Sequence, residues 1–271
     1  MISERVPPIR AVVLDLDGIL LRDDKSVSAR TRVALQRCAE AGILLVLATA
    51  RPPRATQLVL RDVPWFAYAV PYNGTLIIGR TRPLERHLPI PWETGQRLTA
   101  WIATRAPTSH VSYEVKDTWY VTTDDGAAWA DGSRLGAYAP QPVQVDARML
   151  EGVHPTKILV RDYPAWPELA EAFRDTVHVL ATDGGTLVQI MHRDASKEAA
   201  VAGILEAEGV APRAVLVCGD DANDLGLFQL CGFPVAMANA IPALKARAAV
   251  ITASNNDDGV ARVLEQFVLT G

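Results

Sequence analysis

The feature that most constrains the fold of this chain is a short apolar run that ends in two aspartates and a glycine. Residues 9–18 have the sequence IRAVVLDLDG. A short and nearly continuous run of apolar residues with branched side chains is typical of a strand buried on both faces of a parallel sheet. A helical pattern follows at 28–42, and a second apolar run, ILLVLATAR, follows at 43–51. Strand, helix and strand in this order predict a βαβ unit and therefore a parallel sheet.

The C-terminal part of the chain repeats this alternation, whereas the middle does not. Residues 196–210 carry a helical pattern, and residues 213–221, RAVLVCGDD, form another apolar run that ends in acids. In the middle, HVSYEVKDTWYVTT at 110–123 alternates apolar and polar side chains with a period of two. This alternation indicates an antiparallel sheet with one solvated face.

These patterns together predict an α/β protein with two parts. We expect residues 1–82 and 190–271 to form one Rossmann-like core around a parallel sheet. We expect residues 83–189 to form an inserted α+β domain. The order of the patterns requires the chain to leave the core once and return to it.

Composition and charge exclude several classes of protein. The formal net charge is -4 and the pI is about 5.8, so there is no electrostatic reason to bind nucleic acid or an anionic membrane. The first ten residues, MISERVPPIR, lack the apolar stretch of a signal peptide. We therefore expect a cytoplasmic protein without nucleic-acid or membrane partners, acting as a monomer or weak homo-oligomer.

Asp15 and Asp17 are the first candidate site residues. Residues two apart in an extended segment point the same way, so both carboxylates are expected at the carboxyl end of the first strand. That edge is where open α/β sheets bind ligands. A simple Asp-Gly turn is the alternative explanation. Adjacent carboxylates repel each other, however, and need a cation or a proton to offset their charge.

The segment GDDANDLGLF at 219–228 supplies a second acidic cluster. It follows an apolar run and contains Asp220, Asp221, Asn223 and Asp224. If its strand lies beside the first, both clusters face one pocket, and such oxygen-rich clusters hold Mg²⁺. Helix capping explains one of these side chains but not the whole set.

Thr49 and Lys197 are candidate phosphate-binding residues. Thr49 ends an apolar run, and Lys197 opens a helical pattern. A hydroxyl and an ammonium group both bind a phosphate dianion, and the start of a helix also favours an anion. Each residue alone has an ordinary explanation, a helix cap for the threonine and a solvated side chain for the lysine.

Taken together, these four segments resemble the four motifs of the haloacid dehalogenase superfamily of phosphohydrolases, in the same order. The resemblance is closest to the Cof-type branch, which carries a C2-type α/β cap between its second and third motifs. YNGTLI at 72–77 is similar to a segment of that branch, and residues 235–267 are similar to its C-terminal signature. The resemblance implies a HAD-type core with an inserted C2-type cap.

The resemblance also implies roles for the candidate residues. Asp15 corresponds to the nucleophile that forms a phosphoaspartate, and Asp17 to the general acid and base. The implied phosphate-binding residues are Thr49, Lys197 and Asn223.

The implied cofactor is Mg²⁺, and its implied ligands are Asp15, Asp17, Asp220 and Asp224, with Asp17 acting through its backbone carbonyl. The chemistry of the step supports a cation independently. Attack of a carboxylate on a phosphate dianion brings like charges together, and Mg²⁺ and Lys197 would offset them.

Three positions depart from the family's pattern. Ile19 stands where a threonine is usual, Ala50 replaces a glycine after Thr49, and Asp221 replaces a small residue after Asp220. None of these changes removes a reacting group.

The expected activity is Mg²⁺-dependent hydrolysis of small phosphate monoesters, foremost sugar phosphates, so the expected partner is a small phosphorylated metabolite. A phosphotransferase or phosphomutase of the same superfamily stays open, and it would need a cap that excludes water from the phosphoenzyme. A non-catalytic Mg²⁺-dependent binding module is the other alternative. The presence of all four motifs argues against it. The sequence contains no GxSxG, GxxxxGK[ST] or GxGxxG motif.

Overall fold

The computed structural model describes residues 8–122, 129 and 142–269. Residues 123–128 and 130–141 of the predicted insert therefore lie outside the described part of the chain.

The chain divides into two compact units. The first unit contains Met1–Arg51, Thr56–Arg86 and Ser196–Gly271, and the second contains Pro52–Ala55 and His87–Ala195. The chain thus leaves the first unit twice, first at Pro52–Ala55 and then at His87–Ala195, and returns to it each time.

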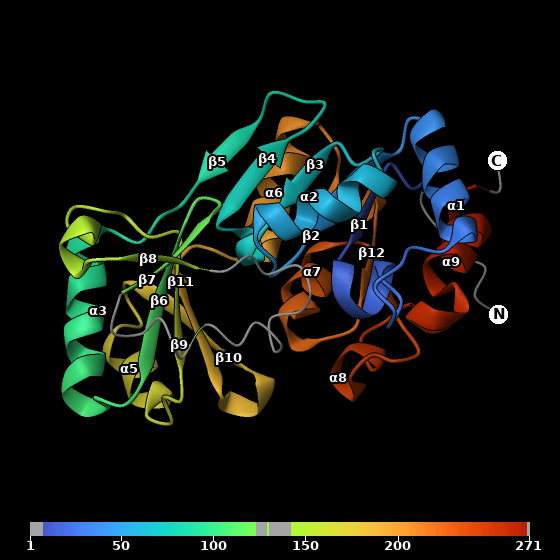
Figure 1. The fold of residues 1–271 in the computed structure, drawn as a ribbon. Helices are drawn as coiled ribbons and strands as arrows, with labels where there is room; N and C mark the ends of the chain where they lie inside the picture. The colour runs from blue at the N-terminus through green and yellow to red at the C-terminus, as the bar shows by residue number, and fades with distance from the viewer. Residues whose placement is uncertain (1–7, 123–128, 130–141, 270–271) are drawn as a thin grey trace. The chain divides into compact units, whose positions relative to one another are not determined.

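The first unit is built on an eight-stranded sheet with the order β14-β13-β12-β1-β2-β3-β4-β5 (Figure 1). β1 pairs in parallel with both β2 and β12, whereas β3 and β4 are antiparallel. The strands are β1 (Ala11–Leu14), β2 (Leu44–Ala48), β3 (Tyr68–Val70), β4 (Leu76–Gly79), β5 (Glu85–His87), β12 (Val215–Gly219), β13 (Phe233–Ala236) and β14 (Val250–Ile251).

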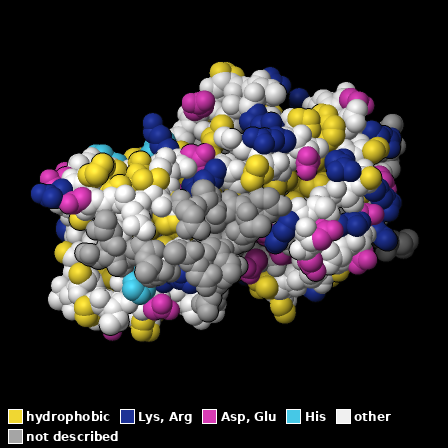
Figure 2. Space-filling view, viewed as in Figure 1, with side chains coloured by type: hydrophobic (Ala, Val, Ile, Leu, Met, Phe, Trp, Pro, Cys, Tyr) yellow, Lys and Arg dark blue, Asp and Glu magenta, His cyan; other side chains and the backbone are white. Residues whose placement is uncertain are grey.

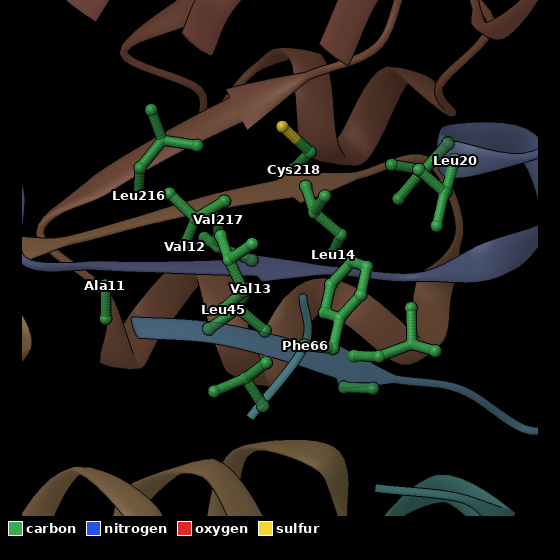
Figure 3. Packing of buried hydrophobic residues seen from close by; sticks show 14 of the residues in the cluster. Ala11, Val12, Val13, Leu14, Leu20, Leu45, Phe66, Leu216, Val217 and Cys218 are labelled. Atoms are coloured by element: carbon green, nitrogen blue, oxygen red, sulfur yellow. The ribbon is translucent and has the colours of Figure 1, made fainter. Parts of the chain in front are cut away.

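The apolar character of β1 follows from its central place in this sheet. All four of its residues are buried, and Figure 3 shows them packed among side chains of the neighbouring strands, Leu45 and Val217 included. A strand buried on both faces has no position for a polar side chain, so the first polar residue, Asp15, comes where the strand ends.

Helices connect the strands of this sheet. Ser28 caps the first of them, because its hydroxyl accepts a hydrogen bond from the backbone N–H of Thr31. α1 and α9 pack side by side, and α6 packs against α7 and the strands β2 and β3 (Figure 1). The helices are α1 (Ala29–Glu40), α2 (Pro53–Asp62), α6 (Lys197–Ala207), α7 (Leu225–Leu230), α8 (Pro242–Lys245) and α9 (Gly259–Phe267).

The second unit has a six-stranded sheet with the order β10-β11-β9-β6-β7-β8. Side chains from α3, α5 and one face of this sheet form a single apolar cluster that includes Leu98, Ile158 and Leu169. The elements are α3 (Trp92–Arg105), β6 (His110–Val115), β7 (Thr118–Thr122), β8 (Val143–Val145), β9 (Lys157–Arg161), α5 (Trp166–Ala172), β10 (Val177–Thr182) and β11 (Leu187–His192).

The predicted fold class, an α/β core with a mainly parallel sheet and an α+β insert, is confirmed. Because β1 and β12 are parallel neighbours, their carboxyl ends meet at one edge of the sheet. In the described part of the chain, no helix is long and apolar enough to cross a membrane. On the face shown in Figure 2, basic and acidic side chains are interspersed rather than separated by sign.

Candidate active site

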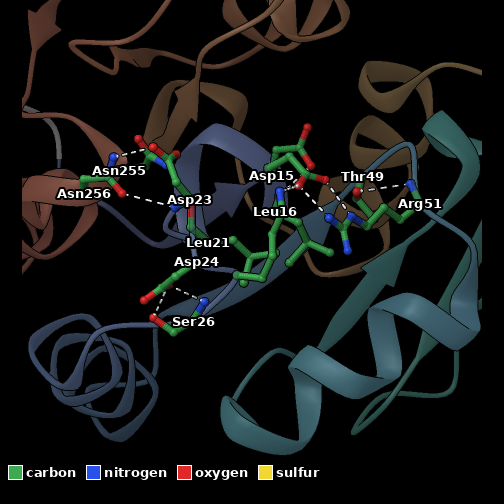
Figure 4. A network of polar contacts seen from close by, with 12 residues as sticks. Asp15, Leu16, Leu21, Asp23, Asp24, Ser26, Thr49, Arg51, Asn255 and Asn256 are labelled. Carbon is green, nitrogen blue, oxygen red and sulfur yellow. Dashed lines mark hydrogen bonds and ion pairs between the residues drawn. The ribbon is translucent and has the colours of Figure 1, made fainter. Parts of the chain in front are cut away.

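Asp15 lies immediately after β1 and is held by two groups. Its Oδ1 accepts a hydrogen bond from the backbone N–H of Leu16 at 2.5 Å (Figure 4), and its Oδ2 lies 2.5 Å from Nζ of Lys197. The side chain is buried. Burial raises the pKa of Asp15 to about 6, although the ammonium of Lys197 acts in the opposite direction.

Lys197 joins Asp15 to a second carboxylate. It is the first residue of α6, is only 1% exposed, and donates to Oδ1 of Asp224 at 2.8 Å. Burial alone would lower the pKa of Lys197, but the two carboxylates outweigh burial and raise it. Lys197 is therefore held as a buried cation beside the predicted nucleophile.

Asp224 orients the neighbouring acidic segment. Its Oδ1 is bound to Lys197, and its Oδ2 accepts a hydrogen bond from the backbone N–H of Asp220 at 3.1 Å. Because both oxygens already have partners, the structure places Asp224 as a support for Lys197 and Asp220. That Asp224 binds a metal ion directly stays a prediction.

Asp220 lies against the turn that follows β1. A Cβ atom added to Gly18 would lie 1.8 Å from Oδ2 of Asp220, so the absent side chain at residue 18 leaves the space that this carboxylate occupies. Gly18 also has a φ of +67°, which favours glycine. Burial, together with the charges of Asp224 and Asp15, raises the pKa of Asp220 to about 7.

Asp17 contacts two cations rather than Lys197. Arg51 donates to both of its carboxylate oxygens at 2.6 Å, and Lys25 donates to Oδ1 at 3.1 Å. Burial would raise the pKa of Asp17, but the contacts with Arg51 and Lys25 outweigh it and lower the pKa. Arg51 was not predicted from the sequence, where its place two residues after Thr49 is the only signal.

Thr49 is buried at the end of β2, where its Oγ1 accepts a hydrogen bond from the backbone N–H of Arg51 at 3.2 Å (Figure 4). Asn223 donates from its side-chain amide to Oδ1 of Asn73 at 3.4 Å, and its own Oδ1 is buried without a hydrogen-bond partner among the described residues. The predicted roles of Thr49 and Asn223 in phosphate binding stay predictions.

Two asparagines from the C-terminal signature tie the turn after β1 to the rest of the core. Asn239 donates to the backbone carbonyl of Gly18 at 2.8 Å and accepts from the backbone N–H of Asn255. Asn255 donates in turn to the carbonyl of Leu21 and to the side chain of Asp23 (Figure 4). These contacts fix the segment that carries Asp15 and Asp17.

The structure accounts for two of the three departures from the family's pattern. Ile19 is buried in the apolar core, where a hydroxyl would need a hydrogen-bond partner. Asp221 is exposed and accepts a hydrogen bond from the backbone N–H of Ala222 at 2.7 Å, so it caps the turn that follows. Nothing in the structure explains Ala50.

The donor set suits Mg²⁺, although no three acidic, histidine or cysteine side chains of the described residues form a complete metal site. Mg²⁺ is held by one or two carboxylates, with water and substrate phosphate completing its shell. Asp15 and Asp220 supply two carboxylates, and the close contact of Asp220 with Gly18 puts it next to the backbone of Asp17. Burial raises the pKa of both side chains, and the charge of Asp224 acts on each in the same direction. A bound cation would offset this crowding of negative charge.

Comparison with known proteins identifies the family. Residues 12–264 match the family described as haloacid dehalogenase-like hydrolase. The chain belongs to this family. The resemblance to the Cof-type branch is thereby confirmed, and so is the predicted enzyme class, a phosphoric monoester hydrolase, with which the names of the relatives agree.

Two curated relatives of this HAD-like hydrolase illustrate the likeness. A 5-amino-6-(5-phospho-D-ribitylamino)uracil phosphatase, YitU from Bacillus subtilis, is 27% identical over 274 residues, covering 94% of this chain and 96% of its own. A phosphoglycolate phosphatase from Methanothermobacter thermautotrophicus is 27% identical over 262 residues, covering 96% of this chain and 99% of its own.

A solved structure supports the same relationship. The TM0651 protein from Thermotoga maritima is 26% identical, superposes with a TM-score of 0.80, and covers 95% of this chain and 97% of its own. The likeness therefore spans both units and not the parallel-sheet core alone.

Proposed function

We propose that this HAD-like hydrolase is a Mg²⁺-dependent phosphatase that hydrolyses small phosphate monoesters through a phosphoaspartate intermediate. The observation that carries the proposal is the buried ion pair between Asp15 and Lys197 at the carboxyl end of the parallel sheet. A carboxylate held beside a buried cation is arranged to attack a dianion, because the cation offsets the repulsion between them.

In the first half-reaction, an oxygen of Asp15 forms a bond to phosphorus while the bond from phosphorus to the alcohol oxygen breaks. Lys197 faces the charge that gathers on the phosphoryl oxygens. The hydroxyl of Thr49 lies at the end of the next strand, β2, and is assigned to a phosphoryl oxygen. Positioning and charge compensation account for most of the rate acceleration in enzymatic phosphoryl transfer.

Asp17 is assigned to the proton transfers. In its protonated form it donates to the departing alcohol oxygen. In its ionised form, which Arg51 and Lys25 favour, it accepts a proton from the water that attacks the phosphoaspartate. This second step releases inorganic phosphate and regenerates Asp15.

Asp15, Asp220 and the backbone carbonyl of Asp17 are the groups that would hold Mg²⁺. When bound, the cation supplies charge neutralisation between the nucleophile and the phosphate. Asp224 would keep Asp220 and Lys197 in place through the two hydrogen bonds of its carboxylate.

We assign substrate selection to the predicted cap at 83–189, with 1–82 and 190–271 as the catalytic core. The residues assigned around Asp15 recognise a phosphate and the charges near it, so they do not distinguish one alcohol from another. Polar and aromatic side chains in the insert suit a hydroxylated alcohol such as a sugar, where an unpaired hydroxyl penalises a wrong substrate. The names of the two curated relatives, whose substrates are small phosphate esters, support this substrate class.

Two measurements separate this proposal from its alternatives. A phosphomutase would be stimulated by a sugar bisphosphate, whereas a phosphatase would not. A non-catalytic binding module would release no phosphate from p-nitrophenyl phosphate.

The direct test compares the wild type with Asp15→Asn, using p-nitrophenyl phosphate with and without Mg²⁺. Asp15→Asn should lower turnover to background with an unchanged fold, because an amide cannot form the acyl phosphate. Removal of Mg²⁺ with EDTA should abolish wild-type turnover, and Ca²⁺ should support less of it, since calcium takes more ligands at longer distances. Substantial turnover by Asp15→Asn, or turnover without metal, would contradict the proposal.

A further inference from the structure

The short segment that follows Thr49 belongs to the second unit. Pro52–Ala55 clusters with that unit, whereas Arg51 on one side and Thr56 on the other cluster with the first. The chain in between contains Arg54, whose side chain is 16% exposed. Contacts of Arg54 therefore bear on residues only three to five positions away in the proposed active site.

Glu114, on β6, binds the guanidinium of Arg54 through both of its oxygens. The two N···O distances are 2.7 Å and 2.8 Å, the paired geometry in which an arginine and a carboxylate bind most specifically. Glu114 is 5% exposed, so water competes little with this contact. The pair is a buried one, not a solvated surface bridge.

Asp117, in the turn between β6 and β7, holds the backbone of the same residue. Its Oδ1 accepts a hydrogen bond from the backbone N–H of Arg54 at 2.7 Å, and its carbonyl oxygen accepts from the guanidinium at 3.2 Å. Because Arg54 lies in the first turn of α2, this N–H has no partner within the helix. Side chain and backbone of Arg54 are thus fixed by one hairpin.

Lys157 completes the charge balance of this cluster. It lies opposite Glu114 in the register of β6 and β9 and is 5% exposed. Burial lowers the pKa of Lys157 to about 8, while Glu114 acts to raise it. Glu114 therefore faces cationic side chains from two elements, Arg54 and Lys157.

Two prolines connect Arg54 to the active-site residues. The sequence from Arg51 to Arg54 is Arg-Pro-Pro-Arg, so two consecutive residues, Pro52 and Pro53, have a fixed φ. With two φ angles fixed, this link has fewer ways to absorb a displacement than an ordinary segment of the same length. Arg51, at its other end, binds Asp17 and donates its backbone N–H to Thr49.

We propose that Glu114 and Asp117 are positioning residues for the phosphatase reaction: they hold Arg54, and through Pro52 and Pro53 they fix Arg51. The inference rests on the proposed function, in which Arg51 holds the proton-transfer residue Asp17. The hairpin between β6 and β7 thereby determines where the carboxyl group of Asp17 lies relative to the leaving group.

Hydrogen exchange of the backbone amides tests the physical link without any assay of activity. In Glu114→Gln, the amide of Arg51, which donates to Thr49, should exchange several-fold faster than in the wild type. Pro52→Gly should have the same effect with Glu114 intact. This variant replaces Glu114→Gln in the test if Glu114→Gln folds poorly. Exchange of the Arg51 amide at the wild-type rate in both variants would overturn the proposal.

Kinetics on two esters test the catalytic consequence. Phenyl phosphate and p-nitrophenyl phosphate have similar shapes, but phenolate is the poorer leaving group and depends more on a proton from Asp17. In Glu114→Gln and Asp117→Ala, kcat/KM should fall about tenfold on phenyl phosphate and less than about threefold on p-nitrophenyl phosphate. Equal losses on both esters would indicate a structural role only and would overturn the proposal.

Glu171→Gln is the matched control, because Glu171 pairs with Arg174 in the same unit and both side chains are exposed. This variant should change neither the exchange rates nor the ratio of the two kcat/KM values. A wild-type protein that hydrolyses neither ester would contradict the proposed function, and hydrogen exchange would then decide the link on its own.

Discussion

Lys197 has the most unusual environment of the predicted site residues. Its side chain is almost fully buried and contacts Asp15 and Asp224, which are far apart in sequence. The sequence identified Lys197 and Asp15 as candidates because each lies at the border of a strong strand or helix pattern. It could not identify their mutual contact, which depends on how α6 packs beside β1.

This charge cluster predicts that Lys197 contributes to stability as well as to catalysis. Lys197→Met should abolish turnover and lower the free energy of unfolding by about 3–5 kcal/mol, because two buried carboxylates lose their counter-ion. The double variant Lys197→Met/Asp224→Asn should regain part of this stability and none of the activity. Urea unfolding of the three proteins measures the difference, and a double variant less stable than the single one would contradict this account.

Arg51 is a residue of the candidate site that the sequence pattern does not predict. An arginine two residues after Thr49 has no local pattern that distinguishes it from a solvated side chain. Its role follows from the distance to Asp17, 34 residues earlier, which only the folded structure provides. The same holds for Arg54, whose partners Glu114 and Asp117 lie 60 and 63 residues later in the sequence.

Among the elements, the strands and helices were more predictable than the turns between them. Periodicity indicated β1, α1 and α6 because burial of one face or both faces dictates where apolar residues fall. The turn after β1 has no such periodicity. Its conformation depends on the positive φ of Gly18 and on contacts with Asp220 and Asn239 from distant parts of the chain.

A pair of glycine substitutions tests the turn after β1. Gly18→Ala should lower kcat/KM by at least about 100-fold and weaken the response to Mg²⁺, because a Cβ at 1.8 Å from Asp220 must displace that carboxylate. Gly42→Ala is the matched control. Gly42 has a φ of +76°, and no atom of the described part of the chain lies within 4 Å of its added Cβ, so this variant carries the backbone strain alone, about 1–2 kcal/mol.

Turnover at several Mg²⁺ concentrations and thermal unfolding of both variants distinguish displacement of Asp220 from backbone strain. Equal losses of activity in the two variants would show that backbone strain, and not the position of Asp220, limits the enzyme.

At the scale of the whole molecule, the sequence predicted an inserted domain from a change of periodicity. The structure has two compact units, and the unit around the parallel sheet is built from three separate stretches of the chain. The boundaries at residues 83 and 189 stay predictions. Pattern alone could not show that the short segment Pro52–Ala55 clusters with the second unit, because prolines at the start of a helix are common in any protein.

The two-unit architecture predicts selectivity for small substrates. On the intact protein, hexose and pentose phosphates should have higher kcat/KM than phosphopeptides, because the insert is assigned to the alcohol and a polymer offers it no single small group to enclose. Differences among the sugar phosphates should be modest, on the order of tenfold. A panel of these esters at fixed Mg²⁺ measures the ranking, and phosphopeptides ranked first would contradict the assignment.

The central claim is that Asp15 becomes phosphorylated during turnover, and trapping the phosphoenzyme tests it most directly. Acid quench within the first turnover, followed by borohydride, reduces an acyl phosphate and converts the aspartate to homoserine. Peptide mass spectrometry should find homoserine at residue 15 only in the presence of substrate and Mg²⁺, and never in Asp15→Asn. Unmodified Asp15 during rapid turnover, or modification at another carboxylate, would contradict the account.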